Sequence, residues 1–139
     1  MRPLAVTILI FFAALFYTCA KSIGEGAESN FEVSLYQCRP VPSNNQATIC
    51  FDSLLTDSRC PANAVCGTIG YAAVKFSLTT NGETNPFKLS TLDMPGLFPG
   101  DTIIAGYKIE FMHLEPYPGT VQGPIPDNAR KAQLKVTKL

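Results

Sequence analysis

Short runs in which apolar and polar residues alternate make up most of this chain, and they constrain the fold more than any other feature. A period of two is that of a β-strand with one face buried and the other exposed to solvent. After residue 20, no long window shows the apolar spacing of a helix. The inward positions of these runs form the predicted core: Val33, Leu35, Ile49, Phe51, Val74, Phe76, Leu78, Ile109, Phe111, Leu134 and Val136.

Clusters of turn residues separate the runs. Asn81-Gly82 is the strongest hairpin signal, because both positions tolerate positive φ. Gly106 is expected to bend or to split the long run at 102–114. One or two helical turns at 61–65 are a further option, since Pro61 suits the first turn of a helix.

About six or seven short strands within about 110 residues predict an all-β fold. The expected architecture is one small antiparallel β-sandwich of the immunoglobulin-like kind over residues 31–139. A small β-barrel is the alternative.

The N-terminal segment, residues 1–20, has the features of an export leader. Arg2 gives a positive start, and the apolar run from Leu4 to Tyr17 is interrupted only by Thr7. This run is too short to cross a bilayer comfortably, but its length suits a signal-peptide core.

Two ways of processing this leader are open. Signal peptidase cleaves after Ala20 in one of them; in the other, Cys19 is acylated and becomes the N-terminus of a lipoprotein. Residues 21–30 (KSIGEGAESN) are polar and rich in Gly and Ser, which favours the lipoprotein with a flexible tether. Several acyl chains on Cys19 would hold the domain on a membrane.

Either way, Cys19 leaves the set of disulfide candidates. Cys38, Cys50, Cys60 and Cys66 remain, and four cysteines in an exported domain imply two disulfides. Their spacings lack the paired C-x-x-C of zinc sites, and the chain has 1 His. No metal site and no cofactor are therefore expected.

Strand parity indicates how the cysteines pair. Odd positions at 31–35 point inward, so the alternation places Cys38 on the outer face, and Cys50 lies outward between two inward residues. These two face each other across a hairpin, and Cys60 and Cys66 then pair by elimination within a short loop. The crossed pairings would draw loop 56–68 over the outer face of that hairpin.

The string at 57–66 (DSRCPANAVC), followed by 70–76 (GYAAVKF), resembles a pattern in small uncharacterised bacterial exported proteins and lipoproteins. The segment 107–118 (YKIEFMHLEPYP) and the run at 132–136 fit the second half of that pattern. The resemblance implies a β-sandwich and export, and it implies no established reaction. The family commonly has Trp where this chain has Thr68, and the chain contains no Trp, so a role of that Trp is not carried over.

Catalysis is not predicted. His113 is the single histidine and lies on a predicted strand beside apolar residues, without a G-x-S-x-G elbow. The carboxylates are scattered singly, and no Gly-rich phosphate loop occurs. The formal net charge of +0 gives no reason to expect nucleic acid as a partner.

Two further groups have two interpretations each, and a third has one. Met94, Leu97 and Phe98 form either an exposed partner-binding tip or a plug that folds back over one end of the sandwich. Asp57 and Arg59 form either a surface pair or a capped turn. The cations of the last run are expected to blunt a sheet edge: Arg130, Lys131, Lys135 and Lys138.

The expected function is that of a non-enzymatic binding or structural module of the cell envelope. It is anchored through Cys19 or is secreted or periplasmic, and its partner is an unidentified protein or envelope component. The alternative is a secreted inhibitor of a protease or other hydrolase. Such an inhibitor would use a constrained loop at Cys60–Cys66 or at Leu97-Phe98.

Overall fold

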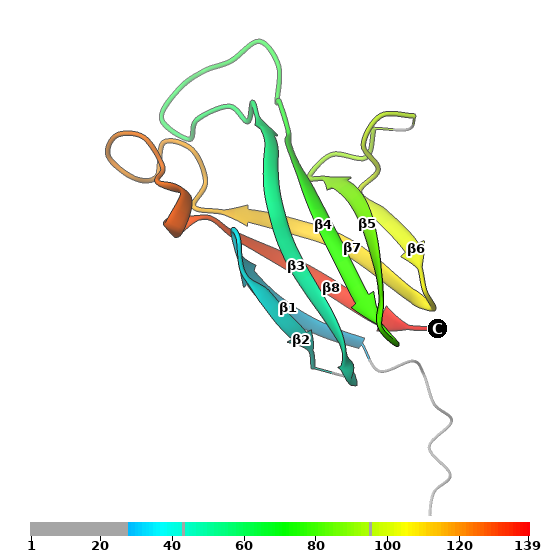
Figure 1. Ribbon diagram of the computed structural model, residues 1–139. Helices are drawn as coiled ribbons and strands as arrows, with labels where there is room; N and C mark the ends of the chain where they lie inside the picture. The colour runs from blue at the N-terminus through cyan, green and yellow to red at the C-terminus, as the bar shows by residue number, and fades with distance from the viewer. Residues whose placement is uncertain (1–27, 43, 95) are drawn as a thin grey trace, which may run out of the picture.

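Two antiparallel sheets of four strands pack face to face in the computed structural model, which describes residues 28–42, 44–94 and 96–139 (Figure 1). One sheet has the order β1-β8-β7-β6 and the other has the order β2-β3-β4-β5. The elements are β1 (Glu28–Ser34), β2 (Cys38–Val41), β3 (Asn44–Asp57), β4 (Ala72–Thr80), β5 (Glu83–Ser90), β6 (Asp101–Ile104), β7 (Tyr107–Glu115), the short 3₁₀ helix η2 (Asp127–Ala129) and β8 (Lys131–Lys138). The leader, most of the tether and the lipidation candidate Cys19 lie outside the described residues.

The predicted all-β sandwich is confirmed, and the sheets do not close into a barrel. The connectivity differs from the Greek key of immunoglobulin domains. Within each sheet the neighbours mostly follow chain order, and the chain changes sheet between β1 and β2 and again between β5 and β6. Alternation and turn signals report which segments are strands. They do not report which sheet each strand joins, so the strand order could not be predicted from the sequence.

The core lies between the sheets and contains every residue predicted for it. Phe76 on β4 is its centre and is fully buried. Its ring lies 5.4 Å from that of Phe51, 5.5 Å from that of Phe87 and 5.6 Å from that of Phe111. Because Phe111 belongs to the opposite sheet, these rings join the two layers.

Two tight turns have the same left-handed conformation. Asn81 and Gly82 (φ 52° and 81°) connect β4 to β5, as predicted for this pair. Ala105 and Gly106 (φ 48° and 80°) connect β6 to β7. Gly106 therefore splits the long run into two strands, which was one of its two expected effects.

Both disulfides pair as predicted. Cys38 and Cys50 are direct neighbours in the register of β2 and β3, and they are bonded. Cys60 and Cys66 close a loop with a sequence separation of 6. The region 61–65 is a turn rather than a helix, with the amide of Ala64 donating to the carbonyl oxygen of Pro61 at 3.0 Å.

The start of β1 and the position of β8 in its sheet differ from what the sequence predicts. Residues 28–30, assigned to the tether, belong to β1 and pair with 135–137 of β8. Because β8 lies between β1 and β7, it is not a sheet edge. Two of its lysines form ion pairs with β1 instead: Lys131 contacts Glu32 at 2.9 Å and Lys135 contacts Glu28 at 3.0 Å.

Candidate functional site

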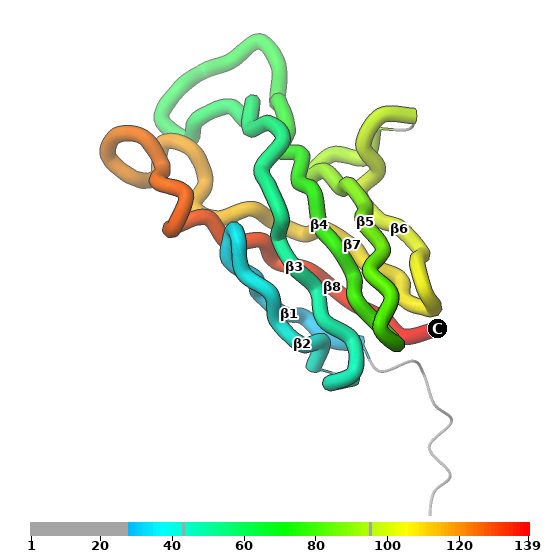
Figure 2. Tube along the Cα trace, in the orientation of Figure 1, coloured from blue at the N-terminus to red at the C-terminus, as the bar shows by residue number. Residues whose placement is uncertain are grey.

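Long connections gather at one end of the sandwich and short ones at the other (Figures 1 and 2). The connections β3–β4 (58–71), β5–β6 (91–100) and β7–β8 (116–130) form the loop end. The opposite end, the turn end, has the short connections β2–β3, β4–β5 and β6–β7. The first described residue, Glu28, and the C-terminus also lie there (Figure 1). The fold therefore presents its least regular segments away from the point where the chain enters β1.

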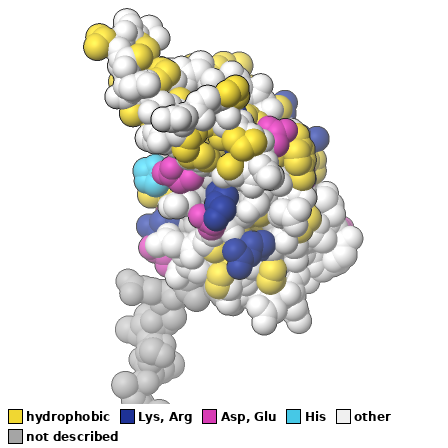
Figure 3. Space-filling view, turned by 90° about the vertical axis from the view of Figure 1, so that its left-hand side faces the viewer, with side chains coloured by type: hydrophobic (Ala, Val, Ile, Leu, Met, Phe, Trp, Pro, Cys, Tyr) yellow, Lys and Arg dark blue, Asp and Glu magenta, His cyan; other side chains and the backbone are white. Residues whose placement is uncertain are grey.

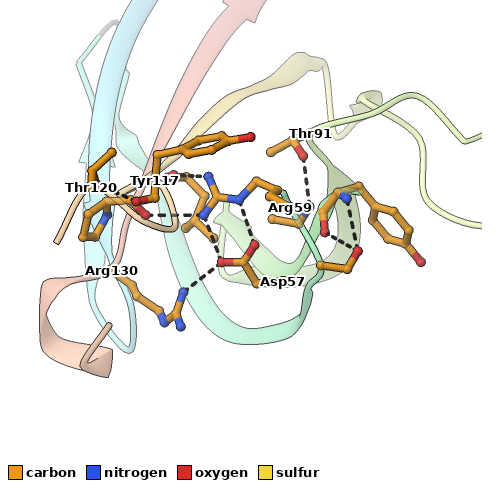
Figure 4. A network of polar contacts seen from close by, with 11 residues as sticks. Asp57, Arg59, Thr91, Tyr117, Thr120 and Arg130 are labelled. Atoms are coloured by element: carbon orange, nitrogen blue, oxygen red, sulfur yellow. Dashed lines mark hydrogen bonds and ion pairs between the residues drawn. The ribbon is translucent and has the colours of Figure 1, made fainter. Parts of the chain in front are cut away.

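Arg59 is the residue that binds the loops of this end to the strands (Figure 4). Its Nε and Nη2 donate to the two carboxylate oxygens of Asp57 at 2.8 and 2.9 Å. Its Nη1 donates to the carbonyl oxygen of Leu114 at 2.6 Å, and Nη2 also reaches that of Pro116 at 3.4 Å. The guanidinium carbon lies 4.8 Å from the centre of the Tyr117 ring. A bidentate carboxylate and an aromatic face are the partners that a planar guanidinium fits best.

Asp57 is shared between two arginines from distant parts of the chain. Arg130 Nη1 donates to Asp57 Oδ2 at 3.1 Å, while Arg130 Nε lies 3.8 Å from Asp127 Oδ1. Burial by itself raises the pKa of Asp57, but hydrogen bonds and attraction from Arg59, with a further hydrogen bond from Arg130, lower that pKa below its usual value. The carboxylate is therefore held in its charged form.

This pair corrects the expectation for Asp57 and Arg59. They do pair, but the pair is buried, with side-chain exposures of 6% for Arg59 and 9% for Asp57. A spacing of two residues suggests a local surface contact. The chain that covers the pair comes from β7 and from the connection β7–β8, which local sequence does not indicate.

The two motifs at 57–66 and 107–118 lie in contact here. The amide of Ala62, in the disulfide loop, donates to the carbonyl oxygen of Pro118 at 2.8 Å. Next to it, Gly119 has φ 80°, and a Cβ at this position would meet Asn63 Oδ1 at 2.6 Å. Glycine is required where these two loops approach each other so closely.

The connection β3–β4 is closed at its base by a short ladder. The amide of Ser58 donates to the carbonyl oxygen of Tyr71 at 2.9 Å, and the amide of Cys60 donates to the carbonyl oxygen of Ile69 at 3.0 Å. Gly70 (φ 66°) lies against this ladder, and a Cβ on it would overlap the carbonyl oxygen of Ser58. The connection β3–β4 is thus a hairpin-like projection that is held at its base by hydrogen bonds.

The connection β5–β6 carries the predicted partner-binding residues, and it combines the two interpretations. Phe98 folds back, with its ring 6.2 Å from that of Tyr71 on the neighbouring loop. The amide of Met94 donates to the carbonyl oxygen of Phe98 at 2.9 Å, which closes the turn. Leu97 at the tip is 58% exposed. Of the three residues, only Leu97 projects into solvent.

A groove of about 310 Å³ runs between these loops and the end of β7. The ring of Tyr117 and the guanidinium of Arg59 line it, and exposed His113 stands on the β7 side. All three guanidinium nitrogens of Arg59 are already engaged by Asp57 and by carbonyl oxygens. Within 28–42, 44–94 and 96–139, no group of three or more His, Cys, Asp or Glu side chains is placed to hold a metal ion.

Exposed aliphatic side chains stand at the tips of the loop end, and sequence reasoning did not select most of them. Val65 has a relative exposure of 103%, Ile69 74% and Val121 41%. Figure 3 shows hydrophobic and uncharged polar side chains on the projection at the top of the view, without Lys, Arg, Asp or Glu. The absence of charge from 60–71, 94–100 and 116–126 was readable in the sequence, but only the fold shows that these segments share one end.

No family model, curated protein or solved structure matches the chain. Membership of the exported family therefore stays a prediction from the quoted motifs. The two disulfides are compatible with an oxidising compartment. In the described part of the chain, none of the helices has the length and apolar character needed to cross a membrane.

Proposed function

We propose that this protein is an exported, non-enzymatic binding module that is tethered at its N-terminus and engages another component of the envelope through its loop end. The observation that carries the proposal is the polarity of the fold. All three long connections lie at the end opposite Glu28, where the chain enters β1. A tether at the turn end leaves the loop end free to meet a partner, and loops on a rigid scaffold are where binding residues usually lie.

The rigidity of the loop end supports a binding role over that of a passive spacer. The disulfide Cys60–Cys66, the buried Asp57–Arg59 pair and the contact of Ala62 with Pro118 fix the loops before any partner arrives. A preorganised surface loses less conformational entropy on binding than a mobile one. A domain that acts only as a spacer does not need loops that are fixed in this way.

Site-specific photo-crosslinking in cells tests the use of the loop end. A photoreactive residue replaces Val65 or Leu97 at the loop end, and Ile103 or Glu83 near the turn end serves as the matched exposed control. Discrete adducts from the first pair and none from the second are expected. Equal adduct yields from both ends, or adducts from the turn end alone, would show that another surface makes the contact.

Anchoring is a separate part of the proposal and has a separate test. Cys19→Ala should abolish incorporation of radiolabelled palmitate. Cys19→Ser, which also lacks the thiol, should behave in the same way. Palmitate incorporation that survives both substitutions would contradict lipidation at this residue.

The inhibitor remains a second candidate because of one observation. Val65 is fully exposed within a loop that Cys60 and Cys66 close. A protease whose primary pocket takes a small aliphatic side chain is the enzyme that such a loop would fit. Stoichiometric inhibition of an elastase-like protease that is lost in Val65→Asp would favour this candidate, and absence of inhibition across serine proteases would remove it.

A further inference from the structure

The loop end carries no charge over most of its length. The segments 60–71, 94–100 and 116–126 contain no Asp, Glu, Lys or Arg, although 16% of the whole chain is charged. The charges next to these segments are Arg59 for the first, Asp93 and Asp101 for the second, and Glu115 and Asp127 for the third. A surface that meets nucleic acid or anionic lipid needs Lys or Arg, which these segments lack. This surface matches an uncharged partner.

Side chains at this end are arranged in two levels. One exposed aliphatic side chain lies on each loop away from its base: Val65, Leu97 and Val121. Half-buried Tyr71 and Tyr117 stand at the bases of their loops, next to the first residue of β4 and the last residue of β7. Aliphatic groups beyond a level of tyrosine rings are the distribution found where a protein enters the interface of a bilayer.

The loops are held together below the tips, so the tips move as one surface. Tyr71 and Phe98 join the connections β3–β4 and β5–β6, with ring centres 6.2 Å apart. Arg59 and Tyr117 join β3–β4 to β7–β8, at 4.8 Å from the guanidinium carbon to the ring centre. The bases of the three loops are therefore fixed relative to one another.

We infer that the loop end inserts its aliphatic tips into the surface of an electrically neutral lipid bilayer. The inference rests on the proposed function and names the partner of the loop end. Val65, Leu97 and Val121 belong to separate loops, with Gly, Asn and Thr residues between the apolar ones. A protein partner needs a contiguous desolvated centre, usually with Trp, Tyr or Arg at its hot spots, whereas fluid acyl chains accept separate side chains without shape complementarity.

An acylated Cys19 and an inserting loop end would attach the domain to lipid at its two opposite ends. Such a domain suits contact between two lipid surfaces, since a single bilayer already holds the anchor at the turn end. For the same reason, binding by the loop end has to be measured without the acyl chains.

Flotation with vesicles tests the inference on residues 21–139, the product of cleavage after Ala20, which carries no acyl chain. Vesicles of phosphatidylcholine alone are compared with vesicles that also contain phosphatidylserine. The protein should float with both to the same extent and independently of salt, because the tips have no charge to be screened. Val65→Asp or Leu97→Asp should lower the partition coefficient about tenfold, since a charge near lipid is costly.

Ile103→Asp is the matched control, because Ile103 is 68% exposed on β6 and does not belong to the loop end. It should float like the parent, and unchanged melting of all variants shows that they remain folded. No flotation with phosphatidylcholine, or an equal loss in Ile103→Asp, would overturn the inference. Protein adducts from the loop end in cells without vesicle binding would also overturn it while the proposed function stands.

Discussion

Phe76 illustrates what alternation in a sequence determines at the scale of a residue. Its neighbours Val74 and Leu78 share its parity, and all three are buried as predicted. Whether a strand residue points inward is a local property with a period of two, so the sequence carries it directly. The burial of Arg59 is different, because it depends on Leu114 and Pro116, which lie far away along the chain. The ion pair of Arg59 with Asp57 was predictable from the sequence, but the burial of Arg59 was not.

Phe76→Ala should lower the free energy of unfolding by about 3–5 kcal/mol, through lost transfer energy and the cavity that remains. Three neighbouring rings would line that cavity, and packed sheets relax only partly. Chemical denaturation measures the change. Tyr36→Ala, at a side chain that is 64% exposed, is the control and should change stability by less than about 0.5 kcal/mol. A cost below about 1 kcal/mol for Phe76→Ala would place the residue outside the core.

Asp57→Asn should cost about 3–5 kcal/mol at neutral pH, because it leaves Arg59 and Arg130 buried without their common carboxylate. Glu83→Gln, which removes an exposed carboxylate, should cost little. The difference in unfolding free energy between the parent and Asp57→Asn should depend on pH. Because the pKa of Asp57 is lowered in the folded state, its contribution is fully present above the unfolded pKa of about 3.9 and is lost as pH falls through the folded pKa. The unfolding free energies of parent and variant should therefore converge in acid, and a constant difference down to the lowest measurable pH would contradict the role of the carboxylate.

At the scale of elements, turn chemistry and strand parity were informative and sheet membership was not. Asn81-Gly82 was readable as a hairpin because both residues favour positive φ. Ala105-Gly106 forms the same kind of turn, yet Ala does not favour that conformation, so the split between β6 and β7 was only one of two expectations. The pairing of Cys38 with Cys50 followed from parity within two neighbouring strands. The order β1-β8-β7-β6 joins distant segments, and no local pattern reports it.

Ala105→Asn should stabilise the protein by about 0.5–1 kcal/mol, because Asn adopts φ near 48° with less strain than Ala. Ala64→Asn, at an exposed position without positive φ, is the matched control and should be close to neutral. Thermal and denaturant unfolding measure both. Ala105→Val should act in the opposite direction, and stabilisation by Val would show that the turn is not left-handed at this position.

At the scale of the whole molecule, the first and last strands are neighbours. β1 pairs with β8 along its full length, and β8 also pairs with β7, so the last strand completes one of the two layers. The two halves of the candidate site likewise come from residues near 57–71 and 114–130. The sequence indicated both motifs separately. Their contact, and the separation of long loops from short turns, are consequences of the complete fold.

A chain that ends at Arg130 should fail to fold cooperatively. It lacks β8, which leaves the ladder edges of β1 and β7 unpaired and removes the buried side chains of Ala132, Leu134 and Val136. Loss of near-ultraviolet circular dichroism and of a sigmoidal denaturation curve is expected. A chain lacking only the exposed Leu139 is the control and should unfold like the parent. A cooperative transition in the shorter chain would mean that β2-β3-β4-β5 forms a stable unit by itself. That outcome would be at odds with Phe76, on β4, since its burial depends on Phe111 of the opposite sheet.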